Sequence, residues 1–166
     1  MPLDVPDGQR CMLDANILYY CFVETAGVSD ECRGLLGRVL TGEVDAITSS
    51  RALGDCVHKT MLAEVSQRNG RSRERLIGWL KQHPEALADL PKSREVCSRL
   101  VRLPLEVAKY EAATLPQVIR IAERHQLLMG DAEIVALMQR HGITHLATND
   151  DDFDRVPGIT VWKPRP

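Results

Sequence analysis

The sequence of 166 residues predicts an α/β fold, a three-layer α/β/α sandwich around a mostly parallel sheet of about five strands. Short apolar runs of strand length alternate with stretches of helical period along most of the chain. This alternation favours parallel strands with helices on both faces of the sheet. The length fits a single domain over residues 1–166, because chains usually divide only at roughly 250–300 residues.

The first half of the chain contains two predicted strands and two predicted helices. Residues 11–14 are short and apolar and end on an acid, which is typical of a strand. Residues 30–40 have four apolar side chains at helical spacing, and Gly42 follows them as a stop signal. Residues 44–48 then predict a second strand, and residues 51–67 predict a helix with one apolar stripe.

The middle of the chain is predicted to be helical. Residues 72–82 have helical spacing, and Pro84 and Pro91 bracket a second short helix. Residues 100–103 are apolar and predict a third strand, which Pro104 ends.

The last third continues the alternation of helices and strands. Pro116 suits the first turn of a helix that runs to residue 125, because a proline there loses no helical hydrogen bond. Residues 131–141 predict another helix, and residues 144–148 and 159–162 predict the last two strands. In such sheets, ligands bind beyond the carboxyl ends of the strands.

The charge is small overall but unevenly distributed. Lys and Arg number 21 against 23 for Asp and Glu, a net charge of -2 that argues against a surface covered in positive charge. Residues 66–102 nevertheless hold nine basic and four acidic residues, a net +5, so the remainder carries -7. We interpret residues 66–100 as a basic helical insertion. Its best candidate patch for contacting RNA phosphates is Arg68, Arg71, Arg73 and Arg75.

Several classes of protein are disfavoured. The longest apolar run, residues 17–23, is far shorter than the roughly 20 residues of a membrane helix, and the N-terminus has no basic segment followed by an apolar one. We therefore expect a cytoplasmic protein that does not contact a membrane. The five cysteines are irregularly spaced without a Cys-x-x-Cys pair, which favours reduced thiols over disulfides or a zinc site.

Carboxylates follow two of the predicted strands. Asp14 closes the first strand, and Asp150 follows the strand at 144–148, so both are expected at the same edge of the sheet. Asp131 begins the helix that leads into that strand. Its neighbours Ile134 and Val135 are apolar, so Asp131 is expected to face the packed side of the helix.

A fourth carboxylate is expected from the helix over residues 51–67. Asp55 lies one turn into this helix, near the strand ends, whereas Glu64 lies nine positions later and about 180° round the axis. The two cannot face the same site, and we favour Asp55. Lys59 follows Asp55 by four residues, a spacing that is typical of an ordinary helix ion pair.

Several carboxylates at one point repel one another unless cations hold them. An acidic cluster without Cys or His suits Mg²⁺ or Mn²⁺, which prefer oxygen ligands and retain water. Such ions lower the pKa of an attacking water and stabilise charge on a phosphate. The cluster therefore predicts metal-dependent phosphoryl chemistry.

These motifs together resemble the PIN domain family over about residues 11–163. They are Asp14-Ala-Asn16 after the first strand, an acid one turn into the helix after the second strand, Asp131-Ala at a late helix start, and Thr148-Asn149-Asp150 followed by Phe153. The resemblance implies an acidic pocket of Asp14, Asp55, Asp131 and Asp150 that is both metal-binding and catalytic. Asn16 and Thr148 would orient the carboxylates, and Asp152 would assist at the metal.

The resemblance implies a Mg²⁺- or Mn²⁺-dependent ribonuclease similar to the VapC toxins of VapBC toxin–antitoxin pairs. A water activated at the metal would cleave RNA to a 5′-phosphate and a 3′-hydroxyl. It also implies a homodimer and a small antitoxin that blocks the pocket. One departure is Asp55, because this position is more often Glu in the family.

Two other functions remain open. A stand-alone PIN protein would bind RNA or a protein partner with weak or no cleavage. A phosphatase of the haloacid dehalogenase type also has an aspartate nucleophile after its first strand, but that family has a second Asp two residues later, where this chain has Asn16.

Overall fold

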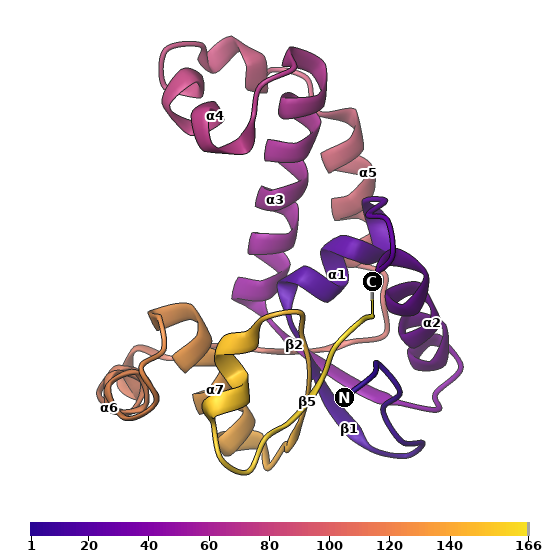
Figure 1. The fold of residues 1–166 in the computed structure, drawn as a ribbon, viewed down its shortest axis with the longest axis vertical. Coiled ribbons are helices and arrows are strands. Elements are labelled where there is room, and N and C mark those ends of the chain that lie inside the picture. Colours follow the sequence, from indigo (N-terminus) through magenta and orange to yellow (C-terminus); the bar gives the residue numbers. More distant parts are fainter. Residues whose placement is uncertain (166) are drawn as a thin grey trace.

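The computed structural model describes residues 1–165, except the side chains of residues 73 and 74. One parallel sheet forms its centre, with strand order β3-β2-β1-β4-β5 (Figure 1). The strands are β1 (Arg10–Leu13), β2 (Asp45–Ser49), β3 (Glu106–Ala108), β4 (His145–Ala147) and β5 (Thr160–Trp162). The predicted α/β fold with a parallel five-stranded sheet is thereby confirmed.

Helices connect the strands and form the outer layers. The α-helices are α1 (Ala15–Phe22), α2 (Ser29–Leu40), α3 (Ser50–Asn69), α4 (Arg73–Leu80), α5 (Pro91–Leu100), α6 (Leu115–His125) and α7 (Met129–His141). Three short 3-10 helices are η1 (Pro84–Leu87), η2 (Ala112–Thr114) and η3 (Asp151–Arg155).

Alternation along the strands divides the core between the two faces of the sheet. Cys11 and Leu13 of β1 pack in a cluster with residues of α1, α2, α3 and α5. Met12, which points the other way, packs with residues of α6, α7 and η3. Both faces of the inner strands β1 and β4 are therefore buried, which explains why they lack an exposed polar face, whereas the edge strand β3 leaves two of its three residues exposed.

Two parts of the sequence prediction differ from the structure. The predicted strand at 100–103 is wrong, because Leu100 ends α5 and the third strand is β3 at residues 106–108. Leu100 and Val96 lie one helical turn apart and are both buried in the cluster that includes α3, so their spacing is helical. Helix α1 was not predicted. It is buried on most sides and lacks the alternation of polar and apolar positions that marks a surface helix.

Helix α3 extends well beyond the sheet. Its 20 residues correspond to about 30 Å, and its far end contacts α4 and η1 (Figure 1). Leu62 and Val65 of α3 form a small separate core there with Leu76 of α4. We call residues 70–90 the cap, because they cover this end of α3.

The cysteines of the chain are free thiols. Four are buried and Cys97 is exposed. Burial raises the pKa of Cys11, Cys21, Cys32 and Cys56 to about 12, so these thiols stay protonated and unreactive. Among residues 1–165 no helix combines the length and apolar character needed to cross a membrane.

Glu64 of α3 stabilises the start of α5. Its carboxylate accepts hydrogen bonds from the backbone N–H groups of Lys92 (3.1 Å) and Ser93 (2.9 Å) and from the Ser93 hydroxyl (2.7 Å). Burial alone would raise the pKa of Glu64, but these hydrogen bonds lower it below 4.5 overall. Glu64 thus caps a neighbouring helix and lies away from the strand ends, as the sequence predicted.

Replacing Glu64 by Ala is expected to reduce the free energy of unfolding by about 1–2 kcal/mol at pH 7, because α5 loses its N-terminal acceptor. Since the carboxyl is more acidic in the folded state, this contribution is present above pH 4.5 and is lost as the pH falls below it. Urea unfolding at pH 7 and pH 3.5 measures both effects. Glu123→Ala, at an exposed position of α6, is the control, and equal losses in the two variants would contradict the capping role.

Candidate active site

The site lies where the strand order of the sheet reverses. From β1 the chain adds β2 and β3 on one side, and β4 and β5 on the other. Leu13, the last residue of β1, pairs with Ala147, the last residue of β4. Asp14 and Thr148 therefore emerge side by side, at the crevice where open parallel sheets bind ligands.

Asp14 is held in place by three hydrogen bonds. One carboxylate oxygen accepts from the backbone N–H of Ala15 at 2.6 Å, which also caps α1. The other accepts from the Asn16 amide at 2.6 Å and the Thr148 hydroxyl at 2.7 Å. Asn16 further bonds Thr148 at 3.0 Å and accepts from the backbone N–H of Asn149 at 3.1 Å. Asn16 and Thr148 thus fix the direction of the Asp14 carboxylate.

Three further carboxylates converge from α7 and η3. One oxygen from each of Asp131, Asp150 and Asp152 lies within 4.8 Å of the others. Asp131 is in the first turn of α7, and Asp150 caps η3 by accepting the N–H of Asp152 at 2.9 Å. All three are half-buried. This spacing allows all three residues to bind one ion.

The carboxylates affect one another's charge. Burial, with the negative charges of Asp150, Asp14 and Asp152, raises the pKa of Asp131 from 3.8 to about 6. Burial also raises the pKa of Asp14, although hydrogen bonds from Thr148 and Ala15 and the charge of Lys59 oppose the rise. The raised pKa values mean that too little positive charge lies near these acids to offset their burial and mutual repulsion.

Asp55 approaches the same pocket from α3, which Ser49 caps directly after β2. Its side chain is 51% exposed and pairs with Arg51, one turn earlier, at 3.6 Å. Arg51 also pairs at 3.3 Å with Glu133 of α7, whose side chain is only 9% exposed. The guanidinium of Arg51 lies over Gly130, where an added Cβ would come within 3.4 Å of it. Arg51 therefore links α3 to α7 across the pocket.

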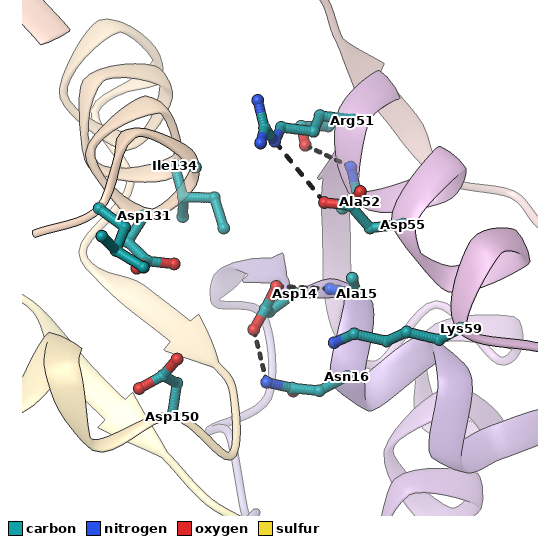
Figure 2. Close-up of a pocket in the computed structure, with 13 residues that line it drawn as sticks. Asp14, Ala15, Asn16, Arg51, Ala52, Asp55, Lys59, Asp131, Ile134 and Asp150 are labelled. Carbon is teal, nitrogen blue, oxygen red and sulfur yellow. Dashed lines mark hydrogen bonds and ion pairs between the residues drawn. The ribbon is translucent and has the colours of Figure 1, made fainter. Parts of the chain in front are cut away.

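These residues surround a pocket of about 240 Å³ (Figure 2). That is well above the roughly 30 Å³ that one water molecule takes up in the liquid, so the pocket has room for a hydrated ion. Its charged lining residues are Asp14, Arg51, Asp55, Lys59, Asp131 and Asp150. The donors are all carboxylate oxygens, and the raised pKa of Asp131 marks a deficit of positive charge. Both observations fit Mg²⁺ or Mn²⁺.

The four aspartates predicted from the sequence thus line one pocket, although they do not contribute equally. Asp152, predicted as an auxiliary residue, belongs to the group of three close carboxylates, whereas Asp14 and Asp55 lie outside that group. Asp55 forms its ion pair with Arg51 rather than with Lys59.

The predicted RNA-contacting arginines lie elsewhere. Arg68 is near the far end of α3, about 20 Å along the helix axis from Asp55. Arg71 stacks on Trp79 of α4, with 4.8 Å from its guanidinium carbon to the ring centroid, and Arg75 is exposed on α4. The side chain of Arg73 is outside the described part of the chain. Arg71, Arg73 and Arg75 therefore belong to the cap, and Arg68 lies beside it at the end of α3.

Two residues beside the predicted aspartates were not predicted from the sequence, Arg51, which lines the pocket, and Glu133, its partner on α7. The sequence does contain a signal for Arg51, because it precedes Asp55 by four residues near a helix start, which is the spacing of a helix ion pair. Glu133 had no such signal, because its partner lies 82 positions away in the sequence.

The PIN domain family model matches residues 11–159 of this chain. None of the curated proteins matches this chain.

Three solved structures are similar in fold. VapC20 from Mycobacterium tuberculosis, a Sarcin-Ricin loop cleaving toxin, is 17% identical with a TM-score of 0.60, over 94% of this chain and 99% of that one. FitAcB from Neisseria gonorrhoeae is 18% identical with a TM-score of 0.58, over 93% and 97%. VapBC2 from Rickettsia felis, bound to a DNA fragment from its promoter, is 16% identical with a TM-score of 0.57, over 93% and 98%.

Replacing Arg51 by Met is expected to destabilise the protein by about 1–2 kcal/mol, because the carboxylate of Glu133 stays buried without its cation. The double variant Arg51→Met with Glu133→Gln is expected to recover part of this loss. Urea unfolding of the two single variants and the double variant gives the coupling energy, and Arg120→Met on the exposed face of α6 is the control. Strictly additive effects would contradict the link between α3 and α7.

In metal-free protein, the free energy of unfolding should fall between pH 4 and about pH 6 because of Asp131. Its pKa is higher in the folded state than in the unfolded state, so the folded state binds the extra proton, and raising the pH through this range removes that advantage. The shift alone corresponds to about 3 kcal/mol, and because the side chain is partly exposed, solvent screening reduces the expected contribution to about 2 kcal/mol or less. Urea unfolding at pH 4 and pH 7 with a chelator should give a smaller fall for Asp131→Asn than for the unaltered protein. The same fall in both would contradict the raised pKa.

Proposed function

The chain belongs to the PIN domain family, and on that premise we propose that it is a metal-dependent endoribonuclease, the toxin of a toxin–antitoxin pair. The observation that carries the proposal is the pocket at the switch point of the sheet. It gathers carboxylates from the end of β1, the segment after β4, the second turn of α3 and the first turn of α7. Carboxylates arranged in this way bind divalent ions that activate a water for phosphodiester hydrolysis. The reaction then needs no protein nucleophile.

Asp131, Asp150 and Asp152 would hold the divalent ion, with Asp14 beside them and Asp55 on the opposite wall. Mg²⁺ or Mn²⁺ bound there would lower the pKa of a water and stabilise negative charge on a phosphate oxygen.

The residues around the ion have separate tasks in this proposal. Asn16 and Thr148 hold the Asp14 carboxylate in one orientation, so its free lone pairs point into the pocket. Asp14 would accept a proton from the attacking water, since burial raises its pKa and it lies outside the three carboxylates that would hold the ion. A water attacks the scissile phosphorus in line, and the bond to the 3′ oxygen breaks, which leaves a 5′-phosphate and a 3′-hydroxyl.

The similar structures support the toxin assignment. One is a toxin that cleaves the Sarcin-Ricin loop, and another is a VapBC2 complex bound to promoter DNA. We accordingly propose a small antitoxin partner, a homodimer and a cytoplasmic site of action. We further propose that residues 66–100 are an insertion in a single domain. Its arginines Arg68, Arg71, Arg73 and Arg75 would contact the RNA backbone away from the site of cleavage.

A second candidate is a PIN protein that binds RNA or a protein partner with little cleavage. The observation in its favour is that Asp55 pairs with Arg51 and is not within the group of three close carboxylates. If the short side chain limits the metal site, Asp55→Glu should increase cleavage, because the extra methylene brings the carboxylate nearer to Asp131 and Asp150.

The central test is cleavage of RNA by purified protein with Mn²⁺ or Mg²⁺. Asp14→Asn and Asp131→Asn are each expected to reduce the cleavage rate at least about 100-fold, because each removes a carboxylate from the metal pocket. Asp89→Asn is the control, since this exposed acid lies between η1 and α5, away from the pocket. A chelator should abolish cleavage. Equal rates in all variants would refute the nuclease assignment, and RNA binding without cleavage by the unaltered protein would favour the second candidate.

A further inference from the structure

The pocket has two walls of different charge. Asp131 and Asp150 lie on one side, and the face of α3 lies on the other (Figure 2). Arg51, Asp55 and Lys59 follow one another at intervals of four residues, so they share that face of α3. Two cations therefore line the pocket opposite the carboxylates of α7 and η3.

The two cations differ in their ion-pair partners. Arg51 is paired with Asp55 and with the buried Glu133. Lys59 forms no hydrogen bond to a described residue, and no carboxylate in the described part of the chain is within 4.0 Å of it. Its side chain is half-buried and runs from α3 towards Asp14 and Asn16 (Figure 2). Its charge also reaches Asp14, whose pKa it helps to lower.

An ordinary helix ion pair does not explain Lys59. The carboxylate at the right spacing, Asp55, is paired with Arg51 instead. A lysine that serves only solubility would extend into solvent, whereas Lys59 lines the pocket and is half-buried. Holding the ammonium there restricts a flexible side chain, which costs conformational entropy that no ion pair offsets.

The charge of the pocket indicates what Lys59 is for. The lining residues include four carboxylates and two cations, a formal charge of -2, and the adjacent Asp152 does not change this sum because it is paired with Arg155. One divalent ion neutralises this charge. Without Lys59 the metal-loaded pocket would remain negative and would repel a phosphodiester. With Lys59 the pocket is neutral and has one unpaired ammonium, a group that binds phosphate oxygens as a point charge.

We propose that Lys59 binds a nonbridging oxygen of the RNA phosphate at the cleavage site, across the pocket from the metal-binding carboxylates. The inference rests on the proposed nuclease function, and it identifies the residue that recognises the anionic substrate. Arg51 has a different task, because its two carboxylate partners hold it between α3 and α7. A phosphate contact of this kind adds affinity without selecting a base sequence.

Binding of a fluorescently labelled single-stranded RNA tests the proposal. Fluorescence anisotropy would be measured with Mn²⁺ in an Asp14→Asn background, which separates binding from cleavage. Lys59→Met is expected to weaken binding about tenfold and to reduce the slope of log affinity against log salt by about 0.7, the value for one phosphate contact to a single strand. Lys59→Arg should restore most of the RNA affinity and most of the salt slope. Arg120→Met, on the exposed face of α6 outside the pocket and the insertion, should bind RNA as the background protein does.

Two further measurements separate this inference from a general loss of structure or function. Calorimetric titration of Lys59→Met with Mn²⁺ should leave the metal affinity within about twofold, since Lys59 is not a ligand. In the otherwise unaltered enzyme, Lys59→Met should raise KM more than it lowers kcat. An unchanged affinity and salt slope in Lys59→Met would overturn the role of Lys59 even if the protein cleaves RNA. If the unaltered protein binds RNA through Lys59 but does not cleave it, the nuclease proposal fails, and of this inference only the phosphate contact of Lys59 stands.

Discussion

The parallel pairing of β1 with β4 is the constraint on which the site depends. It sets Leu13 against Ala147, so that each strand delivers its next residue to the same edge of the sheet. The hydrogen bond from Thr148 to Asp14 joins the two strand ends, and Asn16 closes the network from the start of α1. A shift of one residue in this pairing would separate Asp14 from Thr148 and reverse the faces of one strand relative to the other. The geometry of the acidic pocket is therefore a property of the sheet register rather than of flexible loops.

The fold gathers negative charge at a cost in stability. Asp131 has a raised pKa because its neighbours are carboxylates and its surroundings are partly buried. Arg51 offsets part of this charge by bridging Asp55 and Glu133, and Lys59 offsets part near Asp14. The remaining deficit is what a divalent cation would supply. The net charge of -2 for the whole chain is thus compatible with an RNA substrate, because much of the negative charge is concentrated where a metal would sit.

Much of the fold follows from the sequence because its signals are local. Gly142 ends α7 in a left-handed conformation, and Pro116 lies in the first turn of α6. The strand ends identify Asp14 and Asp150 because parallel strands share one edge. Helix α1 lacked a signal, since it is apolar on most sides, and the edge strand β3 has only three residues, two of them exposed. The bridge from Arg51 to Glu133 depends on how α3 and α7 pack, which no local pattern encodes.

The extension of α3 separates the cap from the central sheet, and these two units differ in the size of the core that stabilises them. The cap rests on a small core of its own, formed around Leu62, Val65 and Leu76, whereas the sheet is stabilised by two large clusters. Local opening of the cap therefore requires far less free energy than global unfolding, so its amide protons should exchange faster than those of β1 and β4. The two tryptophans of the chain divide between these units, with Trp79 in the cap and Trp162 in β5. Intrinsic fluorescence thus provides a reporter for each unit, and an opening of the cap can be followed while the central sheet stays folded.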